Sequence, residues 1–501
     1  MYQTVLAIDL GTSRVKTLLC SEAGEILSRA ECTYPLKQTA EGRAEQNPVD
    51  WLDAVCQCTR ELSVLGLSGW PPVVCSITGQ MHGPVFLDAQ GKVLRDVMIC
   101  SDFRADHELR QIENKIGPET ILQRTGSPGL SLFPGPKMLW VLENEPEVYR
   151  KIHKLMLAKD YIGFAMTGEI ATDVSDASGT MLYNIRTESW DEELCEACST
   201  PLEFLPQIRL ATEPRGEVSR SFSQVSQIPA GTPVIIGAPD LPTTVIGAGL
   251  CSKKDVCVSL GTAGITMRLS DQLREDLLGK IYHFRHIFPG ELISMGSLPG
   301  TGFSVNWFER QILEKPGYYT ERALNEWSQL EEPISLFFLP FLLGTGSPYM
   351  DYRAQGAFLG LSHHHTQSDL RRAILEGISF SIRQSFELLA IEGTPVERII
   401  ACGGGTLNRI WMNILADVLG LPVQSVVQKD TAVLGAAILG GLAQKWFANL
   451  EEGAQRLVGY EEQIQPTTRN ALVYQQAYQT YLKLCATRRN FYPTSLTGKN
   501  P

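Results

Sequence analysis

The stretch from Val5 to Leu19 reads VLAIDLGTSRVKTLL, and the stretch from Asp255 to Leu269 reads DVCVSLGTAGITMRL. The two align without a gap, so that each copy carries the triplet Leu-Gly-Thr at the same place. Each copy has the pattern of a buried strand, a turn of small residues and a second strand. One copy alone would indicate only an ordinary hairpin. Two copies half a chain apart predict a duplicated domain.

Both predicted turns have the residues that hold an anion. Gly11 and Gly261 permit a backbone conformation or a close approach that a larger residue would block. The backbone N–H groups of the turns, together with the hydroxyl groups of Thr12 and Thr262, are suited to a phosphate group. The repeat therefore predicts a phosphate clamp between the two halves of the chain.

The two copies differ at the position where chemistry is expected: Asp9 of the first corresponds to Ser259 of the second. A carboxylate in an apolar strand is costly to bury unless it is paired or bound to a cation. Asp9 is therefore either a turn residue satisfied by local backbone N–H groups or a ligand of Mg²⁺, which binds one or two carboxylates together with substrate phosphates.

The composition limits the classes of protein to consider. The chain has 501 residues, which is too long for one core and predicts two large domains. Hydrophobic residues make up 44% and charged residues 20%, values typical of a globular protein. The net charge of −11, without a long basic run, argues against nucleic acid or an anionic membrane as a partner. No signal peptide or membrane-spanning run is evident, so we expect a cytoplasmic protein.

Two clusters of possible metal ligands are present, and neither has the expected spacing. The only C-x-x-C pair among the twelve cysteines is Cys195 and Cys198, which lies in a stretch with helical periodicity and has no second pair at zinc spacing. The run from His363 to His365 has the sequence context of a solvated loop. We assign no metal to either.

Polar residues follow several predicted strands, at the edge where α/β sheets bind ligands. The strand 73–78 ends in GQMHG (79–83), and the strand 97–100 is followed by Asp102. His82 is therefore either a ligand-binding residue or a structural histidine with a local hydrogen bond. The stretch 172–180 is dense in hydroxyls and carboxylates, which fits either turn chemistry or the wall of a polyol pocket.

Asp240 lies at the junction between the strand 233–237 and a small, apolar helix. This position suits a general base for a substrate hydroxyl group, and it equally suits a helix cap. Further on, the strand 396–401 runs into the triplet 403–405, Gly-Gly-Gly, which favours contact with a nucleotide over a bare turn. The fingerprints GxGxxG and GxxxxGK[ST] are not present here, so the common dinucleotide-binding and P-loop folds are excluded.

Taken together, these segments resemble the FGGY carbohydrate kinases from residue 3 to about residue 485. The segments that carry the resemblance are IDLGTS (8–13), GQMHG (79–83), GPKMLW (135–140), AKDY (158–161), TDVSDASGTM (172–181), SLGTAG (259–264), GGG (403–405) and LGAA (434–437). The resemblance implies an α/β fold of two actin-like (ribonuclease-H-like) ATPase domains with ATP and a sugar in the cleft between them. The domains implied are residues 1–245, with the sugar site and the base, and residues 246–501, with the nucleotide site and a helical tail.

The resemblance also implies a role for each candidate residue. Asp240 matches the catalytic base, and Asp9 would help to hold Mg²⁺. The expected sugar-binding residues are Met81, His82, Asp102 and Asp240. The expected ATP-binding residues are Thr12, Ser13, Gly261, Thr262, Gly404, Gly405 and Asn408.

The activity implied is ATP-dependent phosphorylation of a small sugar, with D-xylulose as the first expectation because of the GQMHG segment. The chain differs from the usual family pattern at Leu241, at Cys100-Ser101 and at Thr345-Gly346. Another ketose, a polyol or a sugar acid is therefore the alternative substrate. The alternative from another class is a non-catalytic actin-like nucleotide-binding regulator. For the assembly, a homodimer is expected only because it is the commonest form.

Overall fold

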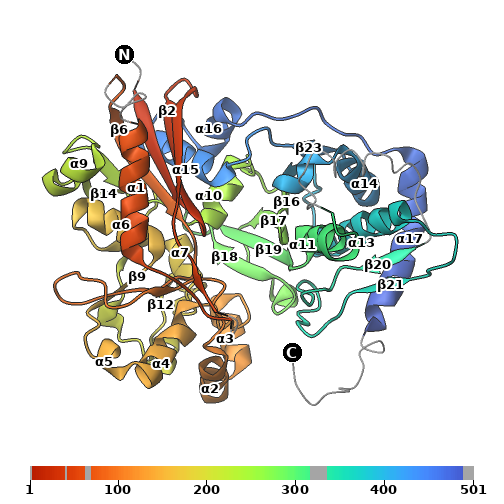
Figure 1. The fold of residues 1–501 in the computed structure, drawn as a ribbon, viewed down its shortest axis with the longest axis horizontal. Coiled ribbons are helices and arrows are strands. Elements are labelled where there is room, and N and C mark those ends of the chain that lie inside the picture. The colour runs from red at the N-terminus through yellow and green to blue at the C-terminus, as the bar shows by residue number, and fades with distance from the viewer. Residues whose placement is uncertain (1–2, 40–41, 63–68, 316–335, 489–501) are drawn as a thin grey trace.

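The computed structural model describes residues 3–39, 42–62, 69–315 and 336–488. It contains two six-stranded sheets, one in each half of the chain (Figure 1). The first sheet has the order β14-β15-β6-β1-β2-β3 and comprises β1 (Thr4–Leu10), β2 (Arg14–Ser21), β3 (Ile26–Thr33), β6 (Pro72–Gly79), β14 (Pro214–Glu217) and β15 (Pro233–Ile235). The second has the order β18-β19-β17-β16-β22-β23 and comprises β16 (Asp255–Leu260), β17 (Gly264–Ser270), β18 (Tyr282–Arg285), β19 (Leu292–Leu298), β22 (Arg398–Cys402) and β23 (Val423–Ser425).

Five of the six strands in each of these sheets pair in the same way. The strand β1 is antiparallel to β2, which is antiparallel to β3, and on its other side β1 is parallel to β6, followed by β15. In the second sheet β16, β17, β19, β22 and β23 repeat these relations in the same order. The duplication predicted from the repeated hairpin is therefore confirmed, as is the two-domain α/β fold class.

The strand β1 reads as a continuous apolar run because both faces of its sheet are covered. All seven of its residues are buried. Leu6 and Ile8 pack in a cluster with Trp51 of the helix α1 (Pro48–Leu62), whereas Val5 and Ala7 pack on the other face with the helix α15 (Thr431–Ala443). The alternation of side chains along the strand thus divides one run between two cores.

The helices α10 (Asp240–Gly247) and α15 cross between the two halves of the molecule (Figure 1). A Cβ atom on Gly247 would lie 1.9 Å from the carbonyl oxygen of Thr431, and one on Gly435 would lie 1.9 Å from that of Thr243. The two backbones therefore touch, and only glycine fits at the crossing. The small, apolar helix expected after residue 240 is the close-packed central helix that its sequence predicted.

The remaining elements surround the two sheets. The other helices are α2 (Asp106–Ile116), α3 (Pro118–Thr125), α4 (Pro134–Asn144), α5 (Pro146–Tyr149), α6 (Ala158–Thr167), α7 (Val174–Ser178), α8 (Glu192–Ala197), α9 (Arg220–Ser226), α11 (Thr301–Trp307), α13 (Gln367–Leu388), α14 (Arg409–Leu419), α16 (Leu450–Leu457) and α17 (Thr468–Ala486), with short turns of helix η2 (Leu202–Phe204), η3 (Glu275–Leu277), η4 (Phe308–Ile312) and η5 (Gly404–Leu407). The other strands are β4 (Lys37–Gln38), β5 (Ala44–Gln46), β7 (Val85–Leu87), β8 (Val97–Met98), β9 (Lys154–Met156), β10 (Ala171–Asp173), β11 (Tyr183–Asn184), β12 (Ser189–Trp190), β13 (Gln207–Arg209), β20 (Phe337–Leu339) and β21 (Ala357–Leu359).

The cysteine pair and the histidine run lie where their sequence contexts predicted. Cys195 and Cys198 are buried free thiols in and directly after α8. The residues 363–365 lie outside any helix or strand, just before α13. Over the described ranges, no three or more His, Cys, Asp or Glu side chains form a group that could hold a metal ion. Nor does any helix in the same ranges have the length and apolar character needed to cross a membrane.

Candidate active site

The first predicted phosphate turn follows β1. The N–H group of Gly11 donates to the carbonyl oxygen of Arg14 over 3.0 Å, which closes the turn. Thr12 and Ser13 are exposed at its tip. The carbonyl oxygen of Thr12 accepts a hydrogen bond of 2.6 Å from the side-chain amide of Gln46, so the turn is held from behind. Its hydroxyl groups thus lie where a phosphate can reach them.

The second turn follows β16 in the same way. The carbonyl oxygens of Gly261 and Thr262 accept the N–H groups of Gly302 and Phe303, over 3.0 Å and 3.1 Å, at the start of α11. These bonds satisfy the first donors of that helix and fix the turn. Thr262 is exposed, as Thr12 is in the first copy. Each half of the chain therefore presents one Gly-Thr turn.

The glycine triplet lies directly against the second turn. Gly403 has a φ of 89°, and a Cβ atom there would lie 2.9 Å from the carbonyl oxygen of Leu260. Gly404 and Gly405 follow at the start of η5. The side-chain oxygen of Asn408 accepts the N–H group of Trp411 over 2.9 Å and so caps α14, while its side-chain nitrogen is buried and has no hydrogen-bond partner within the described ranges. This nitrogen is a donor free for a ligand.

Asp9 is buried near the carboxyl end of β1. Its side chain is 7% exposed, and its Oδ1 atom has no hydrogen-bond partner among the described residues. Burial raises the pKa of Asp9 to about 7; the positive charge of Lys16 opposes this shift and the negative charge of Asp430 adds to it. An orphaned carboxylate oxygen beside a phosphate turn fits a hard cation such as Mg²⁺. The alternative of a turn aspartate satisfied by local N–H groups does not account for the orphaned Oδ1.

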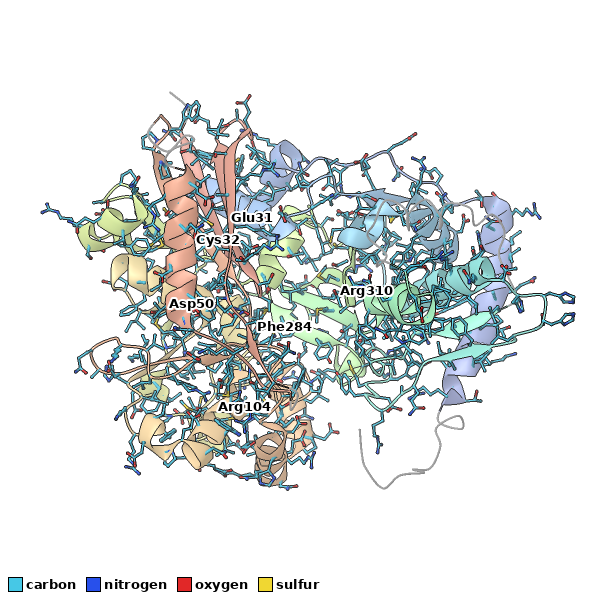
Figure 2. The ribbon with its side chains drawn as sticks, viewed as in Figure 1. Glu31, Cys32, Asp50, Arg104, Phe284 and Arg310 are labelled. Atoms are coloured by element: carbon cyan, nitrogen blue, oxygen red, sulfur yellow. The ribbon has the colours of Figure 1, made fainter. Side chains whose placement is uncertain are left out.

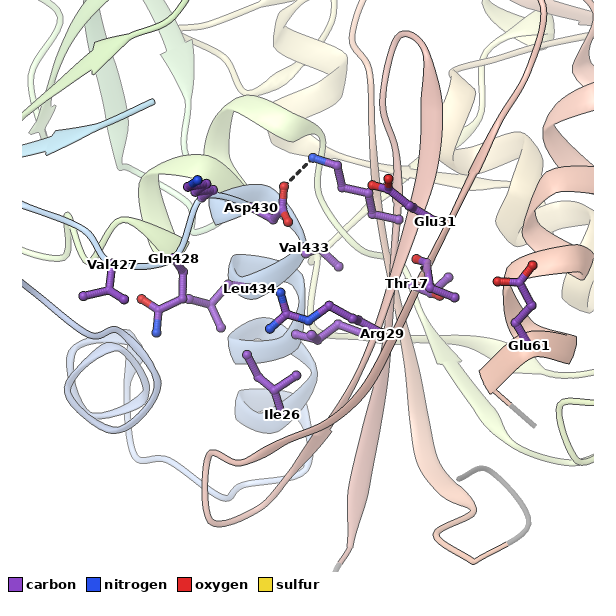
Figure 3. A pocket seen from close by; sticks show the side chains of 14 residues that line it. Thr17, Ile26, Arg29, Glu31, Glu61, Val427, Gln428, Asp430, Val433 and Leu434 are labelled. Atoms are coloured by element: carbon purple, nitrogen blue, oxygen red, sulfur yellow. Dashed lines mark hydrogen bonds and ion pairs between the residues drawn. The ribbon is translucent and has the colours of Figure 1, made fainter. Parts of the chain in front are cut away.

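An ion pair next to Asp9 joins the two halves. The Lys16 ammonium, on β2, lies 2.5 Å from a carboxylate oxygen of Asp430, which precedes α15. The pair forms part of the wall of a groove of about 780 Å³ between the strands β2 and β3 and the helix α15 (Figure 3). Sequence reasoning missed this contact, because nothing in the sequence indicates which residue faces Lys16.

Asp240 is the first residue of α10, directly after the sheet strand β15 and its turn. Its pKa is raised to about 7, mainly by burial and further by the negative charge of Asp9, and local backbone N–H groups oppose the shift. The two carboxylates are therefore close enough to interact. The residue that precedes the helix at the N-cap position is Pro239, so Asp240 is the first helical residue and not the cap residue. The arrangement favours the chemical alternative over the helix cap.

His82 is held in an unusual conformation beside the predicted sugar site. Its backbone φ is 70°, a left-handed value that is uncommon for a residue other than glycine. The ring atom Nδ1 lies 2.8 Å from the carbonyl oxygen of Gly179. Burial lowers the pKa of His82 to about 3, so the ring is neutral. Because a carbonyl oxygen only accepts, Nδ1 carries the hydrogen and Nε2 is left as a hydrogen-bond acceptor.

Aromatic side chains from both halves enclose His82. Its ring centroid lies 4.9 Å from that of Phe133 and 6.4 Å from that of Phe284. Phe284 belongs to β18, the edge strand of the second sheet, and lies where the two halves meet (Figure 2). Met81 is buried in the same apolar cluster. This side of the site is therefore built by both halves of the chain.

Lys137 joins the two segments that carry the predicted sugar residues. Its ammonium group donates to the carbonyl oxygens of His82, Met98 and Ile99 over 3.0, 2.9 and 2.8 Å. Burial lowers the pKa of Lys137 to about 7. Cys100 is the residue after Ile99. Burial raises the pKa of its thiol, the charge of Asp240 adds to this shift, and the charge of Lys137 opposes it. Lys137 was part of a quoted segment, but its role could not be inferred from the sequence.

Asp102, the third predicted sugar residue, is fully buried, and both of its oxygens already have partners. They accept hydrogen bonds from the Arg104 side chain, at distances of 2.6 to 3.1 Å, and from the backbone of Ala44 at 2.8 Å. Arg104 also pairs with Glu45 over 2.9 Å. In this structure Asp102 therefore holds Arg104, and a direct contact with a sugar stays a prediction.

Comparison with known proteins gives a consistent result. A model of the N-terminal domain of the FGGY family of carbohydrate kinases matches residues 4–247, and a model of its C-terminal domain matches residues 256–444. The chain is 31% identical over 481 residues to a xylulose kinase of Bacillus subtilis (strain 168), and the match covers 95% of each protein.

Solved structures agree with this match. A xylulose kinase from Rhodospirillum rubrum superposes with a TM-score of 0.91 at 28% identity, covering 98% of this chain and 99% of that one. A gluconate kinase from Lactobacillus acidophilus superposes with a TM-score of 0.91 at 25% identity, covering 98% of this chain and 100% of that one. The fold is thus shared by kinases whose names give different sugars.

Proposed function

The chain belongs to the FGGY family of carbohydrate kinases, and from this premise we propose that it transfers the γ-phosphate of ATP to D-xylulose. It is a sugar kinase, which favours an enzyme over the actin-like regulator. The observation that carries the proposal is the pair of interacting carboxylates, the buried Asp9 and the half-buried Asp240, together with the Gly-Thr turns. Phosphoryl transfer requires mainly positioning and charge neutralisation, so these few groups are sufficient on the protein side.

In the proposed reaction Asp240 is the general base. Its ionised carboxylate accepts the proton of the sugar hydroxyl group whose oxygen attacks the γ-phosphorus of ATP. A pKa of about 7 is well matched to this task, because a general base works best with a pKa near the operating pH. The exposed hydroxyls of Thr12 and Ser13 would hold the transferring phosphate. Closure of the two halves would exclude water and limit hydrolysis of ATP.

The division of the chain follows from these roles. We assign the sugar site and the base to residues 1–245 and the nucleotide site to residues 246–501. In the second part Gly261 and Thr262 would contact the remaining phosphates of ATP. Gly404, Gly405 and the orphaned side-chain nitrogen of Asn408 would lie along the adenosine.

Asp9 would hold Mg²⁺ through its orphaned Oδ1 atom. A bound magnesium ion supplies positive charge that neutralises the phosphates of ATP as charge develops on them. One protein carboxylate is consistent with this ion, which usually takes few protein ligands and the rest from phosphate and water.

The charge of the site favours a neutral sugar over a sugar acid. His82 is uncharged at neutral pH. Two cations lie near the site, and both already have partners. Lys137 donates hydrogen bonds to three carbonyl oxygens, and Arg104 forms ion pairs with Asp102 and Glu45. With Asp240 facing the same space, a carboxylate on the substrate would meet negative charge without a free cation in the described part of the chain. Gluconate, the substrate named for one structural relative, is therefore the second candidate.

Two further points belong to the proposal. The enzyme would act in the cytoplasm, where ATP is present, and the prediction of a homodimer is retained without further support.

The substrate is tested by measuring ADP release from the purified protein across a panel containing D-xylulose, D-ribulose, gluconate and glycerol. We expect D-xylulose to give the highest kcat/KM, and a clear preference for gluconate would contradict the assignment.

A further inference from the structure

The polar stretch 172–180 divides into groups that serve the turn and groups that do not. A carboxylate oxygen of Asp173 accepts the N–H group of Ser175 over 2.9 Å and caps α7. The hydroxyl of Ser178 donates to the carbonyl oxygen of Ser175 over 2.7 Å, and that of Thr180 donates to the carbonyl oxygen of Ala177 over 2.6 Å. Local turn chemistry therefore explains most of this stretch.

Asp176 is the exception among the charged residues. It is 1% exposed, and neither of its carboxylate oxygens has a hydrogen-bond partner in the part of the chain that the structure describes. Among the described residues it forms one ion pair, with Lys159, over 3.5 Å between the ammonium nitrogen and Oδ2. The hydroxyl of Thr172 is also unpartnered, but a neutral hydroxyl is much less costly to bury than a charge.

The cluster around Asp176 has one carboxylate too many. Lys159 lies 2.7 Å from Asp160 and 3.0 Å from Asp173, and Arg215 lies 2.6 Å from Asp160. Two cations thus face three carboxylates, and Asp176 is the most distant of the three from Lys159. Burial raises the pKa of Asp176 well above its usual range, and the charges of its acidic neighbours add to this effect. A buried carboxyl group of this kind needs a donor that the chain does not supply.

The helix α7, which carries Asp176, is followed by a residue that contacts the predicted sugar residues. Gly179, three positions later, gives its carbonyl oxygen to His82, and a Cβ atom on Gly179 would lie 2.7 Å from the terminal methyl carbon of Met81. The negative charge of Asp240 adds to the raised pKa of Asp176. The orphaned carboxyl group is therefore a neighbour of the proposed base as well as of the residues that enclose His82.

We propose that Asp176 accepts a hydrogen bond from a second hydroxyl group of the sugar, while Asp240 takes the proton of the reacting one. A polyhydroxylated substrate brings the donor that the two orphaned oxygens lack. Two acceptors at fixed positions would then select which hydroxyl group of the sugar faces ATP. This inference rests on the proposed function and adds a specificity-determining residue to it.

The test compares Asp176→Leu, which has a similar volume and no acceptor, with Asp176→Asn, which keeps one acceptor. A matched control is Thr172→Val, which removes the other unpartnered group of the stretch. We expect Asp176→Leu to raise the KM for D-xylulose at least tenfold and Asp176→Asn to raise it at least threefold. The KM should stay within twofold in Thr172→Val. The Kd for ATP, measured without sugar, should stay within twofold in all three.

A structural role for Asp176 predicts a different pattern. If Asp176 is only structural, Asp176→Leu should lower Tm and leave the KM for the sugar unchanged. On our inference the substitution leaves two cations facing two carboxylates, so Tm should stay the same or rise. A KM within twofold of wild type in the leucine variant would overturn the inference. If that variant does not fold, an unchanged KM in Asp176→Asn overturns it instead.

Singly deoxygenated analogues of D-xylulose identify the hydroxyl group. The analogue that lacks the partner of Asp176 should have the same KM with wild type and with Asp176→Leu, and the inference is wrong if every analogue still distinguishes them. The two proposals fail separately. A wild-type protein that phosphorylates no sugar of the panel contradicts the proposed function. An active wild type whose KM for the sugar does not change on substitution of Asp176 contradicts only this inference.

Discussion

Asp9 and Asp240 are far apart in the sequence, yet the negative charge of Asp9 helps to raise the pKa of Asp240. Asp9 lies in the strand at the centre of the first sheet, and Asp240 begins the helix that crosses between the halves. Both have a pKa of about 7, chiefly because of burial. Carboxylates that are destabilised in this way are typical of functional sites, where a cation or a substrate compensates for them.

The first prediction is that Asp240→Asn makes the folded protein more stable at pH 8. The pKa of Asp240 is about 7 in the folded protein, against 3.8 for the usual value. The folded state thus binds the proton more tightly, and ionisation reduces stability as the pH rises from about 4 to about 7. Asparagine has no such penalty. We expect Tm to rise by about 2–4 °C at pH 8 in the absence of ligands.

The gain should shrink as the pH falls and disappear below about pH 3, where the carboxyl group of the wild type is protonated in both states. Differential scanning calorimetry at pH 5 and pH 8 measures the difference. A variant that is less stable than the wild type at pH 8 would show that the Asp240 carboxylate is paired in the folded protein.

The second prediction concerns Asp9→Asn and magnesium. The asparagine side chain offers one amide oxygen, which is a poorer ligand for Mg²⁺ than a carboxylate, and it carries no charge. The Mg²⁺ concentration for half-maximal activity should therefore rise at least about tenfold. The KM for the sugar should stay within about twofold, because Asp9 is not expected to touch it. The control is Glu61→Gln, which removes an exposed carboxylate from the neighbouring groove. An unchanged magnesium requirement in Asp9→Asn would exclude Asp9 as a ligand.

The third prediction is that Lys137→Met weakens the binding of the sugar and the stability of the protein. Methionine removes the ammonium donor that three carbonyl oxygens share, which should cost about 2–4 kcal/mol of unfolding free energy. Since two of the affected segments carry His82 and Cys100, the KM for the sugar should rise at least about tenfold. The Kd for ATP should change little.

Urea unfolding and steady-state kinetics with varied sugar measure these two effects. Lys151→Met, on the exposed surface, is the matched control. A variant that loses stability but keeps the wild-type KM would show that Lys137 supports the fold without positioning the sugar site.

The fold could be predicted from the sequence because its strongest signal is repeated. The gap-free second copy of the hairpin around Gly11 predicted a duplicated domain, and the two six-stranded sheets have matching strand pairing. The small residues around Gly247 predicted a tightly packed helix, and the helix contact requires glycine there. Both signals are local patterns that have one structural explanation.

The candidate site could be predicted only in part. Asp9 lies near the end of a strand and Asp240 follows one, so their positions at the ligand-binding edge could be anticipated. The pairing of Lys16 with Asp430 and the three carbonyl contacts of Lys137 depend on distances between segments far apart in the chain. Asp102 has the expected place after its strand, but Arg104, two residues later, occupies its oxygens. Side-chain partners of this kind are decided by packing and not by spacing.

The role of Asp240 as the base is tested most directly by kcat for Asp240→Asn with saturating ATP, Mg²⁺ and D-xylulose. We predict a loss of about 10²–10⁴-fold, the usual contribution of a general base, with the Kd for ATP within a few-fold of wild type. A variant that turns over within a few-fold of the wild-type rate, with the same affinity for ATP, would contradict the central claim.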